Sequence, residues 1–209
     1  MGWVRIERVT WAERALWAGL VLVSIAPLAL QPAPEAVARA YIAAVDGGDV
    51  EAALDLTATD FVLRPVLGGY YYRREVAGRV LEWRAALNER WQVVGWEYDP
   101  VGQEVRAEVE VMNDAWSLVG SRPRVNLFLS FRDNRLLTEQ VRAEPKDLQR
   151  ALQPFLEWAS TAQPLELTRV WRHGQPVRTA DSALRLVVLL REWRAARDKV
   201  AAGSVQGQD

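Results

Sequence analysis

The sequence predicts an α+β fold in which a bent antiparallel sheet packs on N-terminal helices. Apolar residues in the first part of the chain recur every three or four positions, as they do in amphipathic helices. After residue 91 the apolar period changes to two, which is typical of strands with one buried face. An uncharged segment precedes this core, and a strongly apolar helix pattern follows it.

The composition is that of a globular protein long enough to bury a core. The chain has 209 residues, of which 50% are hydrophobic and 25% charged, and its net charge is −1. Domains that bind nucleic acid usually carry a basic excess, so no nucleic acid is expected as a partner. The chain has no cysteine and one histidine, His173, which we place in a solvated turn. We therefore expect no disulfide, no metal site and no cofactor.

Residues 15–30 form an uncharged run that indicates membrane targeting. As a helix the run is roughly 24 Å long, slightly less than a hydrocarbon core of about 30 Å. Arg5, Arg8 and Arg14 precede it, as basic residues precede a signal peptide or signal anchor. We favour an uncleaved anchor, because Pro27 follows the best cleavage site, with the domain on the extracytoplasmic side. The alternative is a helix that packs on a cytoplasmic domain.

Three helices and one strand are predicted next. The first helix begins near Glu35 and ends at Gly47–Gly48, because glycine tolerates the left-handed backbone that ends helices. Asp49 caps a second, short helix. A strand then ends at Pro65, and a third helix covers Arg74–Trp91. We expect the inner side of the third helix at Val76, Val80, Trp83 or Arg84, and Leu87.

Four antiparallel strands are predicted between residues 91 and 144. Residues 103–114 alternate strictly, with valine and alanine on one face and charged side chains on the other. We expect the charged face to be solvated, and a dimer or partner surface is the alternative. Residues 132–135 form a hairpin turn, and Pro145 opens a further helix.

The chain divides into a hydrophobic segment (1–31), a domain (32–163) and a C-terminal extension (164–209). The extension contains a long helix that Thr179 or Asp181 can cap. Its apolar stripe is wide and needs cover, so we expect it to pack on its own domain; the alternative is docking to a partner or a second copy. The stripe consists of Leu184, Val187, Val188, Leu190 and Trp193, widened by Leu186 and Leu189.

Residues 35–160 resemble the nuclear transport factor 2-like superfamily, in its SnoaL-like and ketosteroid-isomerase-like branch. The stretch AYIAAVDGGDVEAALDLTATDFVLRPVLG carries most of the likeness: a helix, an acidic-glycine break, a second helix that ends near Asp60–Phe61, and a strand. The stretch LSFRDNRLLTEQV is similar to the late hairpin of these proteins. The resemblance implies a cone, in which helices close one side of a curved sheet and the mouth leads to an apolar pocket.

The resemblance also implies where catalytic residues would stand. Tyr41 occupies the position of the isomerase tyrosine that donates to an oxyanion. Arg64 occupies the position of the aspartate base, and Leu127, with Asn126 beside it, that of the second acid. Arginine stays protonated at neutral pH and cannot act as the base. Cyclase relatives use an Asp–His pair, but His173 lies outside the matching region, so we assign no catalytic residue.

Epoxide-hydrolase relatives use an Asp–Arg–Asp relay around a water, to which Arg64 would contribute the arginine. Its acids would be Glu97, Asp99 or Asp114, which are candidates only because they lie near strand ends. Tyr70 follows two glycines and is expected to form a lip over the pocket. The pocket candidates are therefore Tyr41, Arg64, Tyr70, Trp116 and Asn126.

Because the catalytic positions are vacant, the leading hypothesis is a membrane-tethered, non-catalytic binding or assembly module. The alternatives are a SnoaL-like isomerase, cyclase or hydrolase, and a carrier for a hydrophobic ligand. An enzyme requires two acids and Tyr41 at one cavity, a carrier requires a dry cavity, and an assembly module requires a filled cone. The expected partners are a protein or second copy at the sheet face or C-terminal helix, a hydrophobic small molecule, and the membrane through residues 15–30.

Overall fold

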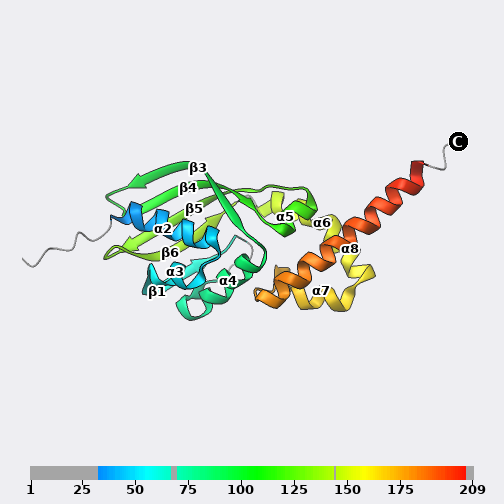
Figure 1. Cartoon of the computed structure of the whole chain (residues 1–209), viewed down its shortest axis with the longest axis horizontal. Coiled ribbons are helices and arrows are strands. Elements are labelled where there is room, and N and C mark those ends of the chain that lie inside the picture. The colour runs from blue at the N-terminus through cyan, green and yellow to red at the C-terminus, as the bar shows by residue number, and fades with distance from the viewer. Residues whose placement is uncertain (1–32, 67–69, 144, 206–209) are drawn as a thin grey trace, which may run out of the picture. The chain divides into compact units, whose positions relative to one another are not determined.

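A computed structural model describes residues 33–66, 70–143 and 145–205, which belong to one compact unit (Figure 1). The predicted membrane anchor at residues 15–30 lies outside the described residues. Within the described ranges, no helix is both long and apolar enough to cross a membrane.

The first two helices begin and end as predicted. Helix α2 covers Pro34–Gly47, and the backbone becomes left-handed at Gly48, with a φ of 72°. Helix α3 covers Val50–Asp55, and the Asp49 side chain accepts a hydrogen bond of 3.0 Å from the Ala52 amide. These ends are confirmed because glycine and a capping carboxylate act locally.

Helix α4 (Arg74–Ala86) begins as predicted but ends before Trp91. Asn88 adopts a left-handed φ of 55°, which turns the chain toward strand β3 (Arg90–Asp99). The predicted inner side is confirmed at Val80, Arg84 and Leu87, which are buried, and wrong at Val76, which is 41% exposed. At the start of α4 the buried residue is Ala77 rather than Val76, and further along the helix the buried side includes an arginine.

Six strands form one curved sheet in the order β2-β1-β6-β5-β4-β3 (Figure 1). Strand β1 runs parallel to β6, whereas the other neighbouring strands are antiparallel, so the antiparallel prediction is wrong for this pair. No hairpin joins β1 to β6, so chain connectivity does not force them to be antiparallel. The remaining strands are β1 (Thr57–Arg64), β2 (Tyr72–Arg73), β4 (Glu104–Met112), β5 (Arg124–Arg132) and β6 (Arg135–Arg142).

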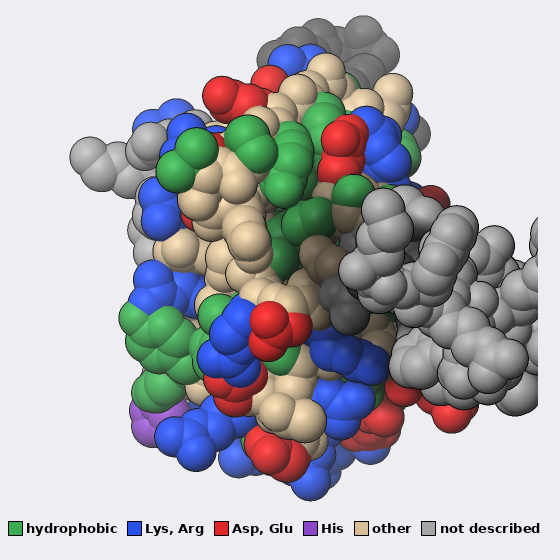
Figure 2. Space-filling model, turned by 90° about the vertical axis from the view of Figure 1, so that its left-hand side faces the viewer, with side chains coloured by type: hydrophobic (Ala, Val, Ile, Leu, Met, Phe, Trp, Pro, Cys, Tyr) green, Lys and Arg blue, Asp and Glu red, His purple; other side chains and the backbone are tan. Residues whose placement is uncertain are grey.

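The inner face of the sheet packs on α2 and α4 and forms the first hydrophobic core. The predicted alternation is confirmed in β4, where Val105, Ala107, Val109 and Val111 are buried. Asp133 and Asn134, with φ of 52° and 57°, make the predicted two-residue turn between β5 and β6. On the face drawn in Figure 2, basic and acidic side chains are interspersed, and neither charge dominates.

A short helix between β4 and β5, α5 (Asp114–Val119), was not predicted. The Asn113 side chain caps it by accepting a 2.8 Å hydrogen bond from the Trp116 amide, and Gly120 ends it at a φ of 74°. Its residues are too few to show a helical period, although both end signals are present in the sequence.

The C-terminal part forms a second, helical layer. It comprises α6 (Pro145–Ala162), α7 (Pro164–Val170), a hairpin of β7 (Trp171–Arg172) and β8 (Gln175–Pro176), and α8 (Ala180–Val205). The sequence predicts a short strand and turn over this segment, whereas the structure forms helix α7 before the hairpin. Pro164 at the start of α7 favours a helix. His173 is exposed in the hairpin turn, as expected.

Helix α8 packs on α4, α5 and α7, which confirms that most of its stripe is covered by its own domain. The stripe is nevertheless rotated, because Leu184 and Val188 are 58% and 51% exposed. The buried side is Ala183, Leu186, Val187, Leu189, Leu190 and Trp193.

Candidate functional site

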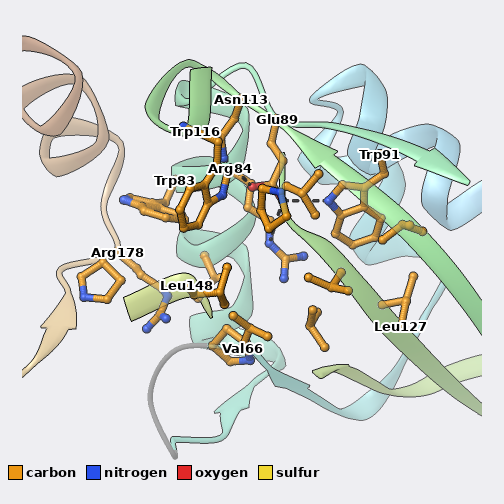
Figure 3. A pocket seen from close by; sticks show the side chains of 18 residues that line it. Val66, Trp83, Arg84, Glu89, Trp91, Asn113, Trp116, Leu127, Leu148 and Arg178 are labelled. Carbon is orange, nitrogen blue, oxygen red and sulfur yellow. Dashed lines mark hydrogen bonds and ion pairs between the residues drawn. The ribbon is translucent and has the colours of Figure 1, made fainter. Parts of the chain in front are cut away.

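A cavity of about 90 Å³ lies between α4, the inner face of the sheet and the start of the C-terminal layer (Figure 3). Its walls are mostly apolar, formed by side chains such as Val109, Val125 and Leu127. The space is therefore roomy enough for several waters or for one compact organic group. The charged side chains on the wall, among the described residues, are Arg84, Glu89 and Arg178.

Arg84 reaches this cavity because of its position on α4. It lies four residues after Val80, so the two side chains share the inward face of the helix. Glu89 follows the end of α4, and Asn113 follows the end of β4. The ends of a helix and a strand therefore bring three polar side chains to one wall (Figure 3).

The Arg84 guanidinium is held between two buried carboxylates. Its Nη2 lies 2.7 Å from Glu139 Oε1, and its Nε lies 3.5 Å from Glu89 Oε1. The exposed fractions are 5% for Arg84, 7% for Glu89 and 0% for Glu139. Charges removed from water in this way require close partners, so the three side chains form one interdependent cluster.

Further donors fix both carboxylates. The Tyr41 hydroxyl donates to Glu139 Oε2, on the side away from Arg84. Trp91 Nε1 donates to Glu89 Oε1 at 2.9 Å, and Asn113 Nδ2 donates to Glu89 Oε2 at 3.1 Å. Each carboxylate therefore has both oxygen atoms engaged, which fixes the orientation of Arg84 as well.

Burial and the neighbouring charges perturb this cluster. Burial raises the pKa of the Tyr41 phenol well above its ordinary value, and the adjacent Glu139 charge adds to the effect, while Arg84 opposes it. Burial alone would lower the pKa of Arg84, but the carboxylates of Glu139 and Glu89 raise it above its ordinary value. At neutral pH the cluster therefore contains a neutral phenol and a charged guanidinium.

One nitrogen of Arg84 is left over. Its Nη1 is buried and has no hydrogen-bond partner in the described part of the chain, whereas Nε and Nη2 face carboxylates. Figure 3 shows the Arg84 guanidinium among the side chains that line the cavity. Buried donors without an acceptor are rare in native proteins, so this nitrogen indicates a missing acceptor.

The structure brings two of the five predicted pocket residues to this site. Trp116 lines the cavity, and Tyr41 lies behind the wall, where it holds Glu139. Arg64 stacks on the Tyr71 ring, with Cζ 3.9 Å from its centroid, Tyr70 is 59% exposed, and Asn126 is exposed on the outer face of β5. These last three residues do not line this cavity.

Sequence reasoning did not select Arg84, Glu89 or Glu139 as site residues. A weak signal existed for Arg84, because a charged residue occupied a position on the apolar side of a predicted helix. Glu139 faces inward on β6, but a shift of register between β5 and β6 obscures the alternation there. Among the described residues, no group of three or more His, Cys, Asp or Glu side chains is arranged to hold a metal ion.

Comparisons with known proteins find similar solved structures that match a little over half of this chain. One is a nuclear transport factor 2-like protein of unknown function from Cytophaga hutchinsonii, at 12% identity over 58% of this chain and 98% of that chain, with a TM-score of 0.47. Another is a candidate polyketide cyclase from Xanthomonas campestris, at 16% identity over 58% of this chain and 98% of that chain, with a TM-score of 0.49. A third is an epoxide hydrolase/cyclase-like enzyme described in pyran ring formation in polyether salinomycin. It is 13% identical over 55% of this chain and 92% of that chain, with a TM-score of 0.46.

No protein-family model and no curated protein sequence matches the chain. The three similar structures are all under 25% identical to this chain, with TM-scores under 0.5. The activities in those names belong to those proteins, because one fold of this kind supports many functions.

Proposed function

We propose that the protein binds a compact, largely apolar small molecule in the cavity and holds an oxygen acceptor of that molecule with Arg84. The observation that carries this proposal is the buried Nη1 of Arg84, which has no acceptor among the described residues. A buried donor left unsatisfied costs about 1–3 kcal/mol, so a bound acceptor is favoured at this position. The apolar walls supply the rest of the binding energy.

Binding without turnover is favoured over catalysis by the state of the acids. Glu89 is the one carboxylate on the cavity wall among the described residues, and Arg84, Trp91 and Asn113 already occupy its oxygen atoms. Glu139 is engaged by Tyr41 and Arg84 and does not line the cavity. A general base needs a free oxygen within reach of the proton it removes, and neither carboxylate offers one.

A second candidate function is hydrolysis or isomerisation of the bound molecule. One observation favours it: Glu89, Arg84 and Glu139 form an acid–arginine–acid row, as in the relay that the resemblance implies for epoxide-hydrolase relatives. In that case Glu89 would activate a water in the cavity. Turnover of a small epoxide that Glu89→Gln abolishes, with the fold and ligand binding retained, would replace the binding function by this one.

The assembly hypothesis requires a filled cone, and the cavity beside Arg84 favours a small-molecule function instead. Membrane tethering remains a prediction on residues 15–30, and it is independent of the cavity. Fractionation of cells that express the full chain tests it: recovery in the soluble fraction without detergent would contradict the anchor.

The binding function is tested by titrating the ¹⁵N-labelled full chain with two compact molecules of the same shape, isobutyramide and isobutyrate. Trp83, Trp91 and Trp116 line the cavity, so we expect their indole signals to shift saturably with at least one of these molecules. Val109→Leu extends into the cavity and should weaken binding several-fold. Val105 is a buried neighbour on β4 that does not line the cavity, so Val105→Leu is the matched control.

If no indole signal moves with either molecule, the proposed function is wrong. Equal weakening by the two leucine substitutions would assign the effect to overpacking of the core rather than to the cavity, and it would also contradict the proposed site.

A further inference from the structure

We propose that a groove beside the cavity binds the phosphate group of a phosphomonoester. The groove has a volume of about 470 Å³. It shares Pro123 and Leu148 with the wall of the cavity but none of the polar residues there, so this inference does not depend on the proposed function. The polar side chains of the groove are Ser121, Arg122, Arg124, Asn126 and Arg142.

Sheet pairing brings the groove residues together from separate parts of the sequence. Arg122 lies between α5 and β5, Arg124 begins β5, and Arg142 ends β6. Because β5 and β6 are antiparallel, the beginning of one strand lies beside the end of the other. Asn126 stands opposite Arg142 in this ladder, and both side chains are exposed, so they share the outer face of the sheet.

The polar lining of the groove is cationic. Three of its residues are arginines, which stay charged at neutral pH, and no carboxylate lines it in the described part of the chain. A hydroxyl or carbonyl oxygen could accept from these donors, but it would leave their charge without a counterion. An oxyanion accepts the same hydrogen bonds and also offsets the charge, and such charge-assisted hydrogen bonds are stronger.

Nearby acids reduce the charge of one arginine in particular. Arg124 Nη1 lies 3.8 Å from Glu108 Oε1, and Glu110 stands opposite Arg124 in the ladder between β4 and β5. Neither glutamate lines the groove. Arg124 is therefore partly neutralised from the side of β4 and contributes less to the binding of an anion than the other two arginines.

Arg122 and Arg142 have no carboxylate partner within the described ranges. Arg142 donates a 2.9 Å hydrogen bond to the neutral amide of Gln140, and its Cζ lies 4.3 Å from the centroid of the Phe128 ring. These contacts orient the Arg142 guanidinium but do not neutralise it. Arg122 has neither a side-chain hydrogen bond nor an ion pair with a described residue.

Two cations without acidic partners match a dianion. A phosphate with one ester bond carries a charge of about −1.5 to −2 at pH 7, and three of its oxygen atoms are strong hydrogen-bond acceptors. A carboxylate or a phosphodiester carries a single charge. The groove is larger than a phosphate group, so the organic part of the ester can lie in it as well.

Methyl phosphate and dimethyl phosphate test the proposal, because they have similar shapes and differ by about one charge at pH 7.5. The ¹⁵N-labelled full chain is titrated with each, and the backbone amide signals of Ser121, Arg122 and Arg124 are followed. We expect these signals to shift saturably, and we expect methyl phosphate to bind at least about threefold tighter than dimethyl phosphate.

Arg122→Gln and Arg142→Gln should each reduce this preference, because each removes one of the two cations. Arg106→Gln is the matched control. Arg106 is exposed on the same face of the sheet and its guanidinium also lies over the Phe128 ring, but it does not line the groove.

Soluble esters and lipid head groups both present a singly esterified phosphate. Glycerol 3-phosphate represents the first source, and phosphatidylcholine vesicles that contain phosphatidic acid represent the second, with phosphatidylcholine vesicles alone as the background. Shifts with glycerol 3-phosphate and no effect of phosphatidic acid would assign a soluble ester. Co-sedimentation that requires phosphatidic acid, and that Arg122→Gln and Arg142→Gln abolish, would assign a lipid head group.

Three results would overturn the inference. Equal or tighter binding of dimethyl phosphate would exclude the phosphomonoester class. A preference that survives in both groove variants, or that Arg106→Gln reduces equally, would contradict the assignment to this groove. No shift of the three amide signals with either phosphate would exclude the site itself. The indole signals that report on the cavity are separate, so each of these results leaves the proposed function standing.

Discussion

The two hydrophobic cores of this protein differ in their polar content. The core inside the cone, between the sheet and helices α2 and α4, surrounds the buried Arg84, Glu89 and Glu139. The core of the C-terminal layer is built from apolar side chains such as Phe155 and Trp193, whose rings meet edge to face at 6.1 Å. In that layer Ser182, which caps α8, is the buried polar residue among those described.

We interpret this difference as a division of roles: the apolar core of the C-terminal layer stabilises the fold, and the polar core of the cone holds the candidate site. Apolar side chains stabilise a core more reliably than ion pairs do, because burying charge carries a desolvation cost that the pair often fails to recover. The C-terminal layer follows that rule and covers the cone. The cone violates it at Arg84, beside the cavity, and such local exceptions are expected at functional sites.

The largest expected effect comes from removing the charge at the centre of the cone. Arg84→Met leaves two buried carboxylates without their cation, and we expect it to lower the free energy of unfolding by about 3–5 kcal/mol at pH 7. Urea denaturation measures the loss. The double variant Arg84→Met/Glu139→Leu should be more stable than Arg84→Met alone, because it removes one unpaired charge together with its partner.

Leu190→Ala provides the comparison in the C-terminal layer. Leu190 is fully buried, and its truncation is expected to cost about 2–5 kcal/mol through lost burial and a cavity. Ligand binding should survive this variant, since Leu190 does not line the cavity.

The prediction for Arg84→Met has its own contradicting outcome. If Arg84→Met proves neutral, or if its cost simply adds to that of Glu139→Leu, the cone cluster is not the interdependent unit described above.

A smaller effect is expected at Tyr41. Tyr41→Phe removes the donor to Glu139 Oε2 and leaves a buried acceptor unsatisfied, so it should cost about 1–3 kcal/mol near pH 7. The pKa of Tyr41 is raised in the folded protein, so its contribution to stability is complete below the ordinary phenol value of about 10. This contribution is lost as pH rises through the higher folded value.

The wild-type protein and Tyr41→Phe should therefore approach each other in stability above about pH 10. Unfolding free energies measured for both between pH 7 and pH 11 test this. A gap that stays constant or widens over that range would mean that burial and Glu139 do not raise the pKa of the Tyr41 phenol. Comparing differences between the two proteins removes the contribution of other groups that titrate in alkali.

Several features of the fold could be predicted from the sequence, whereas the candidate site depends on contacts between residues far apart in the chain. The end of α2 at Gly48, the cap at Asp49 and the turn at Asp133–Asn134 arise from local backbone preferences, so residue type was enough. The site depends on residues far apart in sequence. Arg84 and Glu139 are separated by 55 positions, and no period or spacing in the chain reports that pairing.

Tyr41 also shows that the sequence does not report long-range pairing. Periodicity predicted the helix that contains Tyr41, and the resemblance assigned this residue a role toward a ligand. Its partner Glu139 lies 98 positions away, and that contact makes Tyr41 a support for the site behind the wall. Arg64 and Asn126 were chosen for their neighbours along the chain, but the fold directs them elsewhere.

The smallest expected effect compares two helix caps. Asn113 and Asp49 each accept a hydrogen bond from the first turn of a short helix, at 2.8 Å and 3.0 Å. Replacing either with alanine should cost about 1 kcal/mol through the lost cap. Asn113 also donates to Glu89 on the cavity wall, so Asn113→Ala should cost more than Asp49→Ala and should also change ligand affinity.

Thermal unfolding and the indole titration, run on both variants, make this measurement. Asp49→Ala reports the cost of a cap on the cone without a contact to the cavity, and it should leave the indole shifts unchanged. If the two variants lose equal stability and both bind as the wild type does, the hydrogen bond from Asn113 to Glu89 contributes nothing to the site. In that case the orientation of Glu89 depends on Arg84 and Trp91 alone, and the wall nearest α5 serves only to enclose the ligand.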